Sequence, residues 1–416
     1  MFVEEHSPSP FSYGAVLKPH METSSGSLHP EMALPAPAPV SVRSRHYPAL
    51  DSLRGLAAVV VVFSHYILLW DPSSVGHGTR LLLDGVLVPF FNGRSSVILF
   101  FLLSGFVLSL PYKRGNALPY HIFFLRRLAR IYVPYVAALA LALVADWRFH
   151  GPLPMSRWSN LTWTAPLTWP LILQNFLLIG NYDTAQVNTA FWSLAVEMRL
   201  SILFPLLCLP LLRLKRSYTF LLFAALVVFN IAAVQIFAHR MRPVSFTNMA
   251  EMIAGTVAFA AGILLSRWLE LFQTTWGRTP ALQRILFFAI SLTTLEWSAN
   301  LPVPHAWIFA DVLPVAGGCG VLIATLCSRR VTRILSHRLP AWLGRVSYSL
   351  YLVHATVLFS LMHLFFARAT RLELLAPYLL LSLLSATAFF FLVEKPCIHL
   401  SRTIGRSGRT LSKQPV

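Results

Sequence analysis

The stretch LDSLRGLAAVVVVFSHY, residues 50–66, decides the class of the fold. It is long and apolar enough to form a membrane-spanning helix, and it carries Asp51 and Arg54 near its start and His65 near its end. At about 100° per residue, Arg54 and His65 return to one helix face about 16 Å apart along the axis. An imidazole at that depth is costly in lipid, so we expect His65 to face a polar interior or a neighbouring helix.

The composition extends this interpretation to the whole chain. Of its 416 residues, 56% are hydrophobic and only 12% are charged, whereas soluble proteins carry about 25% charged residues. Apolar runs recur throughout, so we predict one all-α, polytopic membrane domain over residues 46–397. Residues 1–45, rich in proline and serine, are predicted to be a flexible N-terminal tail, and residues 398–416 a basic C-terminal tail.

The apolar runs predict ten membrane-spanning helices. Their ranges are roughly 50–70, 95–111, 131–147, 190–212, 218–238, 250–267, 284–299, 306–327, 345–366 and 373–393. A further apolar run, residues 170–179, is too short to cross, so we expect it to be re-entrant or interfacial. The connection over residues 148–189 is rich in tryptophan and proline and is long enough to form a lid.

The basic residues predict the orientation of the domain. A formal charge of +18 would suggest a nucleic-acid partner in a soluble protein, but here lysines and arginines lie at helix ends, so no nucleic acid is expected. With ten helices and both termini in the cytoplasm, 25 of the 34 basic residues fall on the inner side. The positive-inside rule therefore favours cytoplasmic termini in a multi-pass protein of the cell membrane, the inner membrane in a bacterium. The sequence does not indicate an oligomeric state.

A carboxylate in the predicted fourth span is the second candidate functional group. In FWSLAVEMRLSILFPLL, residues 191–207, Glu197 shares a helix face with Ser193 and Ser201 at i−4 and i+4. A glutamate there costs about 2.5–3.5 kcal/mol unless it is paired or protonated. A structural salt bridge is one interpretation. The other is that Glu197 lies at the depth of His65, bonds its imidazole and orients it.

Three arginines precede the predicted third span. In LRRLARIYVPY, residues 125–135, Arg126 and Arg130 share a face at i and i+4, with Arg127 beside them. Arginines suit bidentate recognition of phosphate. Ordinary positive-inside placement is the alternative.

A polar stripe runs along the predicted ninth span. In LGRVSYSLYLVH, residues 343–354, Ser347, Tyr351 and His354 recur at i, i+4 and i+7. Either hydrogen bonding between helices or substrate contact would account for them. The four cysteines form no CxxC and no cluster with metal-ligand spacing, so no metal site is predicted.

Taken together, these motifs resemble those of the acyltransferase 3 family of integral membrane acyltransferases. The matching segments are LDSLRGLAA followed by His65, FFLLSGFVLS, RRLAR, FWSLAVE and LGRVSYSLYLVH, in family order over roughly residues 47–396. The resemblance implies transfer of an acyl group to a hydroxyl or amine of a glycan, lipid or small molecule, O-acetylation of a glycan being one such reaction. The implied donor is acyl-coenzyme A, a co-substrate, with no permanently bound cofactor.

The resemblance also implies roles for particular residues. His65 would be the catalytic histidine, Arg54 its motif partner, and Arg126, Arg127 and Arg130 the contacts to the phosphates of the donor. The chain departs from the common family pattern WSLAVEEQFY, because Arg199 and Ser201 stand where the family has glutamine and tyrosine.

Two other functions remain open at this point. A proton-coupled transporter or exporter of a lipid-linked or acylated substrate could use His65 and Glu197 as a proton relay, and inverted repeats would support it. No internal repeat is recognisable in the sequence. A non-catalytic membrane scaffold is the other, and it would not need the full set of motif residues.

Overall fold

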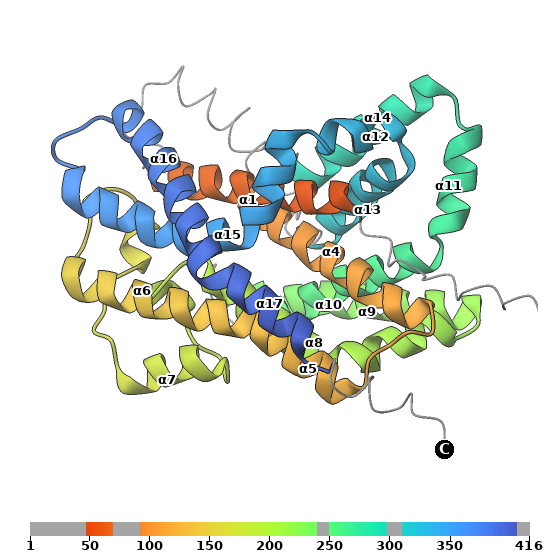
Figure 1. The fold of residues 1–416 in the computed structure, drawn as a ribbon, viewed down its shortest axis with the longest axis horizontal. Helices are drawn as coiled ribbons and strands as arrows, with labels where there is room; N and C mark the ends of the chain where they lie inside the picture. Colours follow the sequence, from red (N-terminus) through yellow and green to blue (C-terminus); the bar gives the residue numbers. More distant parts are fainter. Residues whose placement is uncertain (1–46, 70–91, 239–248, 298–309, 406–416) are drawn as a thin grey trace, which may run out of the picture. The chain divides into compact units, whose positions relative to one another are not determined.

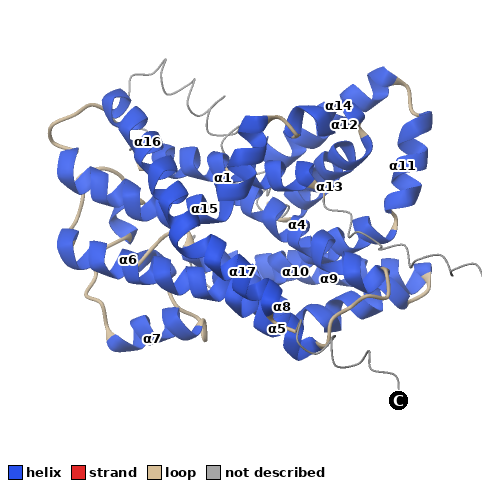
Figure 2. Cartoon of the chain, viewed as in Figure 1, coloured by secondary structure: helices blue, strands red, loops and turns tan. Residues whose placement is uncertain are grey.

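The structure is a computed structural model that describes residues 47–69, 92–238, 249–297 and 310–405. Helices make up 83% of these residues, which contain no strand (Figure 2). The predicted N-terminal tail, residues 1–45, lies outside the described residues, as does most of the predicted C-terminal tail.

Figure 1 shows the helices in chain order by colour. Up to the middle of the chain they are α1 (Pro48–Leu68), α4 (Gly93–Lys113), α5 (Tyr120–Arg127), the π turn η3 (Leu128–Tyr132), α6 (Val133–Phe149), η4 (Ser159–Leu161), α7 (Trp169–Leu177), η5 (Thr184–Gln186), α8 (Phe191–Arg213) and α9 (Arg216–Ala238). Then come α10 (Met249–Arg267), α11 (Leu269–Arg278), α12 (Ala281–Trp297), α13 (Val312–Cys327), α14 (Arg329–Leu335), α15 (Arg338–Phe365), α16 (Arg371–Phe389), the π turn η8 (Phe390–Glu394) and α17 (Lys395–Thr403).

Eight of the described helical spans are long and apolar enough to cross a membrane, and a ninth is added if α13 and α14, bent by 93° at their junction, form one span. The described part of each of the ten predicted segments falls on a helix, and residues 70, 298–299 and 306–309 of those segments lie outside the described residues. Helix α12, with 17 residues, is shorter than the eight. Helix α7 has nine residues and is too short to cross, as predicted. The segment expected to be a tail from residue 398 begins as the end of α17.

Burial separates the interior helices from those at the periphery. Helix α4 packs against α10, and α1 against α15. In the apolar stretch of α10 that is long enough to cross the membrane, 83% is buried inside the protein, whereas in that of α9 only 22% is buried. Leu221 and Phe229 on α9 and Leu384 on α16 are exposed. Apolar surface of this kind is expected where helices face lipid instead of water.

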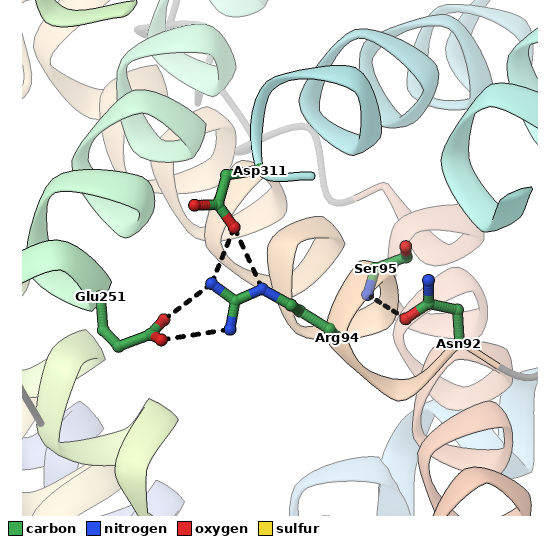
Figure 3. Close-up of polar contacts among 5 residues, drawn as sticks. All are labelled: Asn92, Arg94, Ser95, Glu251 and Asp311. Carbon is green, nitrogen blue, oxygen red and sulfur yellow. Dashed lines mark hydrogen bonds and ion pairs between the residues drawn. The ribbon is translucent and has the colours of Figure 1, made fainter. Parts of the chain in front are cut away.

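An ion cluster joins the starts of three helices (Figure 3). The guanidinium of Arg94, in the first turn of α4, donates to both carboxylate oxygens of Glu251 on α10, at 3.2 and 3.0 Å. It also donates to Oδ1 of Asp311, directly before α13, at 3.0 and 2.7 Å. Asn92 caps α4, because its Oδ1 accepts from the amide of Ser95. Charge-assisted bonds therefore fix where α4, α10 and α13 meet.

Candidate active site

Two glycines bring α1 and α15 into backbone contact. A Cβ added to Gly55 would lie 2.5 Å from the amide nitrogen of Gly344, and one added to Gly344 would lie 2.5 Å from the carbonyl carbon of Asp51. Only residues without a side chain allow this approach. His65 lies ten residues after Gly55, and His354 lies ten residues after Gly344. The two helices therefore run in the same direction from this contact to the two histidines.

The imidazoles of His65 and His354 are hydrogen-bonded to each other, and we call them the histidine pair. Nδ1 of His65 lies 3.0 Å from Nε2 of His354. Nδ1 of His354 lies 3.0 Å from the carbonyl oxygen of Leu350 and 2.9 Å from that of Tyr351. Because a carbonyl only accepts, the network assigns the hydrogen of neutral His354 to Nδ1 and makes its Nε2 the acceptor. His65 then donates from Nδ1, and its Nε2 keeps a lone pair.

A tryptophan from the long connection lies against His65. The ring of Trp158 is 5.1 Å from that of His65 and stacks on Phe359 at 5.5 Å, centroid to centroid. Ser156 donates to the carbonyl oxygen of Leu68, at the end of α1, at 2.8 Å. Part of the segment predicted as a lid therefore contacts the histidine pair.

Hydrogen bonds of Gly151 and Trp163 hold the same connection on both sides of Trp158. Trp163 is fully buried, and its indole nitrogen donates to the carbonyl oxygen of Val187 at 3.1 Å. Its φ of 60° lies in the left-handed region, which bulky residues rarely adopt. The amide of Gly151 donates to the carbonyl of Trp163 at 2.8 Å, and Nε2 of His363 lies 3.2 Å from the carbonyl oxygen of Gly151. These contacts hold Trp158 in place from both ends of the segment.

Glu197 is paired with an arginine. Its Oε1 accepts from Nη2 of Arg127 and from the hydroxyl of Ser104, each at 3.0 Å. Arg127 also donates to the hydroxyl of Ser201 at 3.1 and 2.8 Å. The expected bond between Glu197 and His65 is not among the contacts of the described residues. The two side chains differ in depth, since Glu197 lies with Arg127 and within range of Arg54 near the start of α1, whereas His65 is near its end and faces α15.

The three arginines of RRLAR have three different environments. Arg126 donates to the carbonyl oxygen of Ile404, after α17, at 3.1 and 2.8 Å. Arg127 is held by Glu197. Arg130 is exposed and makes no hydrogen bond or ion pair with the described part of the chain. Arg130 lies in the π turn η3, whereas Arg126 is in the last turn of α5.

Arg54 belongs with these arginines and not with His65. It forms an ion pair with Asp51 at 3.2 Å and lies within electrostatic range of Arg127, Arg130 and Glu197. We call Arg54, Arg127 and Arg130 the arginine group. The structure therefore divides the predicted site residues into the histidine pair and the arginine group, towards opposite ends of α1.

The polar stripe on α15 is used unevenly. His354 reaches His65. The hydroxyl of Tyr351 lies 2.6 Å from that of Ser193 and donates to the carbonyl oxygen of Ala190 at 3.1 Å, so it ties α15 to the start of α8. Ser347 donates to the carbonyl of Gly344 in its own helix.

Sequence reasoning missed three residues that join the arginine group to the rest of the bundle. Oε2 of Glu394 accepts from the amide and the hydroxyl of Ser349 at 3.2 and 2.5 Å. The hydroxyl of Tyr348 donates to the carbonyl oxygen of Ile131, inside η3, at 2.8 Å. The signal for Glu394 was a carboxylate at the end of a long apolar run. Ser349 and Tyr348 carried little signal, since both lie off the stripe.

Arg199 on α8, one of the departures from the family pattern, binds the segment that follows α7. It donates to the carbonyl oxygens of Leu178 and Gly180, just after that short helix, at 2.9 and 2.7 Å. No three His, Cys, Asp or Glu side chains gather to hold a metal ion within the residues that the structure describes.

The fold and the partly buried histidine pair define a multi-pass helical membrane protein with polar side chains in its interior. A family model described as an acyltransferase domain, Acyl_transf_3, matches residues 47–395. The chain therefore belongs to the acyltransferase 3 family and is an acyltransferase acting on groups other than aminoacyl groups. No curated protein and no solved structure matches the chain.

Proposed function

We propose that the protein transfers an acyl group from acyl-coenzyme A to a hydroxyl or amine of a glycan, lipid or small-molecule acceptor, with His65 as general base. The observation that carries the proposal is the histidine pair. Its hydrogen bonds leave Nε2 of His65 as a proton acceptor held in a fixed orientation. An oriented imidazole with one free lone pair is what general-base catalysis at a hydroxyl requires.

The proposed step balances without another reactant. Nε2 of His65 takes the acceptor's proton as the acceptor oxygen or nitrogen attacks the thioester carbonyl. The carbon–sulfur bond then breaks, and the thiolate of coenzyme A takes the proton back from His65. His354 accepts the Nδ1 hydrogen of His65 throughout, so it fixes the tautomer and shares the transient positive charge. A carboxylate would stabilise that charge more strongly, so His354 acts chiefly by orientation.

The arginine group is the proposed phosphate site of the donor. Arg130 is exposed and unengaged among the described residues, and Arg54 lies within its electrostatic range. Arg127 and Arg126 are occupied by Glu197 and Ile404, so we assign them to holding the site together. Glu197 is then a positioning residue for Arg127 and not a partner of His65.

We place the protein in the cell membrane, with both termini in the cytoplasm. The donor then meets the arginine group from the cytoplasm, and the acceptor reaches His65 from the other side, beside Trp158. Arg54 and His65 are about 16 Å apart along α1. An extended thioester arm between phosphates and acyl group would have to bridge such a separation.

The experiment is release of free coenzyme A by the purified protein in liposomes, measured with a panel of acyl-coenzyme A donors and candidate hydroxyl acceptors. We expect acceptor-dependent release that His65→Ala lowers by about 10²–10⁴-fold. Wild-type turnover in a folded His65→Ala protein would refute the role of His65. Binding of no acyl-coenzyme A by the wild type would refute the donor.

A further inference from the structure

Two π turns lie beside the proposed donor site, each carrying one charged residue. Arg130 is in η3 (Leu128–Tyr132), and Glu394 ends η8 (Phe390–Glu394). Both turns contact α6 and α17, so the end of the chain's last long helix lies next to the entry of the third span. Single π turns inside α-helices are rare and often occur at functional sites. The structure thus places a carboxylate near the arginine that the donor is proposed to contact.

The carboxylate of Glu394 is fixed in position. Its side chain is buried, with 7% exposure, and Oε2 takes both hydrogen bonds from Ser349 on α15. Two donors to one oxygen hold the carboxyl group in one orientation. Glu394 is therefore a permanent feature of the site and not a mobile surface charge.

Glu394 acts on Arg130 through space. The two interact electrostatically but form no ion pair within hydrogen-bonding distance among the described contacts. Tyr348 lies within electrostatic range of Glu394, Glu197 and Arg127. A phosphate bound at Arg130 would therefore meet the repulsion of a buried carboxylate as well as the attraction of the arginines.

We propose that Glu394 sets the affinity of the arginine group for the donor and for released coenzyme A, by weakening both. The inference rests on the proposed function, since it takes the arginine group as the phosphate site. Arg54 and Arg127 are already paired with Asp51 and Glu197. Among the described residues, Arg130 is therefore the arginine whose charge only Glu394 offsets. Without Glu394, Arg130 would hold the phosphates of the product as tightly as those of the substrate. Binding both equally well gives no rate advantage, and tight product binding slows turnover. Glu394 is accordingly a positioning residue that acts on the ligand's phosphates through the field at Arg130.

The test is Glu394→Gln, measured as the Kd of coenzyme A by calorimetry on the purified full-length protein in detergent. Glutamine keeps the shape and can still accept from Ser349, so only the charge is lost. We expect the Kd to fall about tenfold at low salt, equivalent to about 1.4 kcal/mol. The KM of the acyl-coenzyme A should fall in parallel, kcat should fall because release slows, and high salt should shrink the difference.

Two control variants separate charge from structure. Glu270→Gln removes a carboxylate that is exposed and pairs with Lys113, so it makes the same change in net charge away from Arg130. Its Kd should equal that of the wild type. Ser349→Ala removes a tie between α15 and η8 but leaves the charge on Glu394. Ser349→Ala should not tighten the binding of coenzyme A. If the Ser349–Glu394 pair is purely structural, both Ser349→Ala and Glu394→Gln will lower thermal stability and leave the Kd unchanged.

Arg130→Gln distinguishes the failure of this inference from the failure of the proposed function. Weaker binding in Arg130→Gln with unchanged or weaker binding in Glu394→Gln would overturn the role of Glu394 alone. No effect of Arg130→Gln on the Kd would overturn the phosphate site, and the inference with it. A wild type that binds no coenzyme A would overturn both.

Discussion

Gly55 and Gly344 mark the point at which the backbones of α1 and α15 touch, and each precedes a histidine of the histidine pair by ten residues. A methyl group at Gly344 would lie 2.5 Å from the backbone of Asp51, closer than real Cβ contacts come. The contact is therefore the reference point that sets how far apart His65 and His354 lie.

Gly344→Ala should push the helices apart and lengthen the bond between the two imidazoles. Overpacking of this kind costs about 1–3 kcal/mol, and we expect acyl transfer to fall more than stability does. The matched control is Gly277→Ala on α11, where an added Cβ meets nothing within 4 Å. It should be neutral or slightly stabilising in a thermal unfolding assay. Equal activity of Gly344→Ala and Gly277→Ala would contradict this account.

His354 should affect turnover through its Nε2 atom, which accepts the Nδ1 hydrogen of His65. His354→Ala removes the acceptor, so His65 loses its fixed tautomer, and we expect about a 10²-fold loss in kcat with donor binding intact. His354→Gln keeps an oxygen that can accept the Nδ1 hydrogen and should recover part of that loss. His399→Gln, on the exposed face of α17, is the control. If glutamine and alanine at position 354 behave alike, the ring has another role.

The fold was largely predictable because lipid leaves few choices. A span must satisfy its own backbone hydrogen bonds, so a long apolar run predicts a helix directly. The bounds of α8 and α10 agree with the predicted 190–212 and 250–267 to within a residue or so. A bend such as that between α13 and α14 carries no comparable signal, because apolar composition does not record direction.

The site was harder to predict, because an apolar run fixes neither the exact depth of a polar side chain nor the rotation of its helix. Glu197 and His65 were expected at one depth, but Glu197 pairs with Arg127 near the Arg54 end of α1. Arg126 bonds the carbonyl oxygen of Ile404, and a contact between residues so far apart in the chain leaves no local pattern in the sequence. Gly55 and Gly344 each precede a histidine by ten residues, but only the contact between the two glycines turns that equal spacing into a histidine pair.

Arg94 should contribute to stability and not to chemistry. It stands between Glu251 and Asp311, whose side chains are 3% exposed. Removing the cation from a buried ion cluster typically costs about 3–5 kcal/mol. Arg94→Gln should therefore lower the melting temperature strongly while turnover per folded molecule is kept. Arg278→Gln, exposed at the end of α11, should do neither. A stable but inactive Arg94→Gln protein would instead point to a role in the reaction.

Glu197 and Arg127 should behave as a coupled pair. If Glu197 acts by holding Arg127, then Glu197→Gln and Arg127→Gln will each lower the free energy of unfolding and the turnover. The loss in the double variant will be smaller than the sum of the two single losses. A coupling of about 0.5–3 kcal/mol is expected for residues in direct contact. The measurement is thermal unfolding and turnover for all four forms of the double-mutant cycle. Direct action on His65 would instead make Glu197→Gln lower kcat in the Arg127→Gln background as much as in the wild type.

The orientation can be tested with single cysteines, because the four natural ones, Cys208, Cys319, Cys327 and Cys397, can first be replaced by serine. Arg157 and Lys215 are both exposed, on the connection next to Trp158 and between α8 and α9. The excess of basic residues predicts that these two positions lie on opposite sides of the membrane, with Lys215 in the cytoplasm. A membrane-impermeant maleimide added to intact cells should label Arg157→Cys at once and Lys215→Cys only after permeabilisation. The reverse pattern would put Trp158 and the histidine pair towards the cytoplasm, and the donor and acceptor would then have to exchange sides.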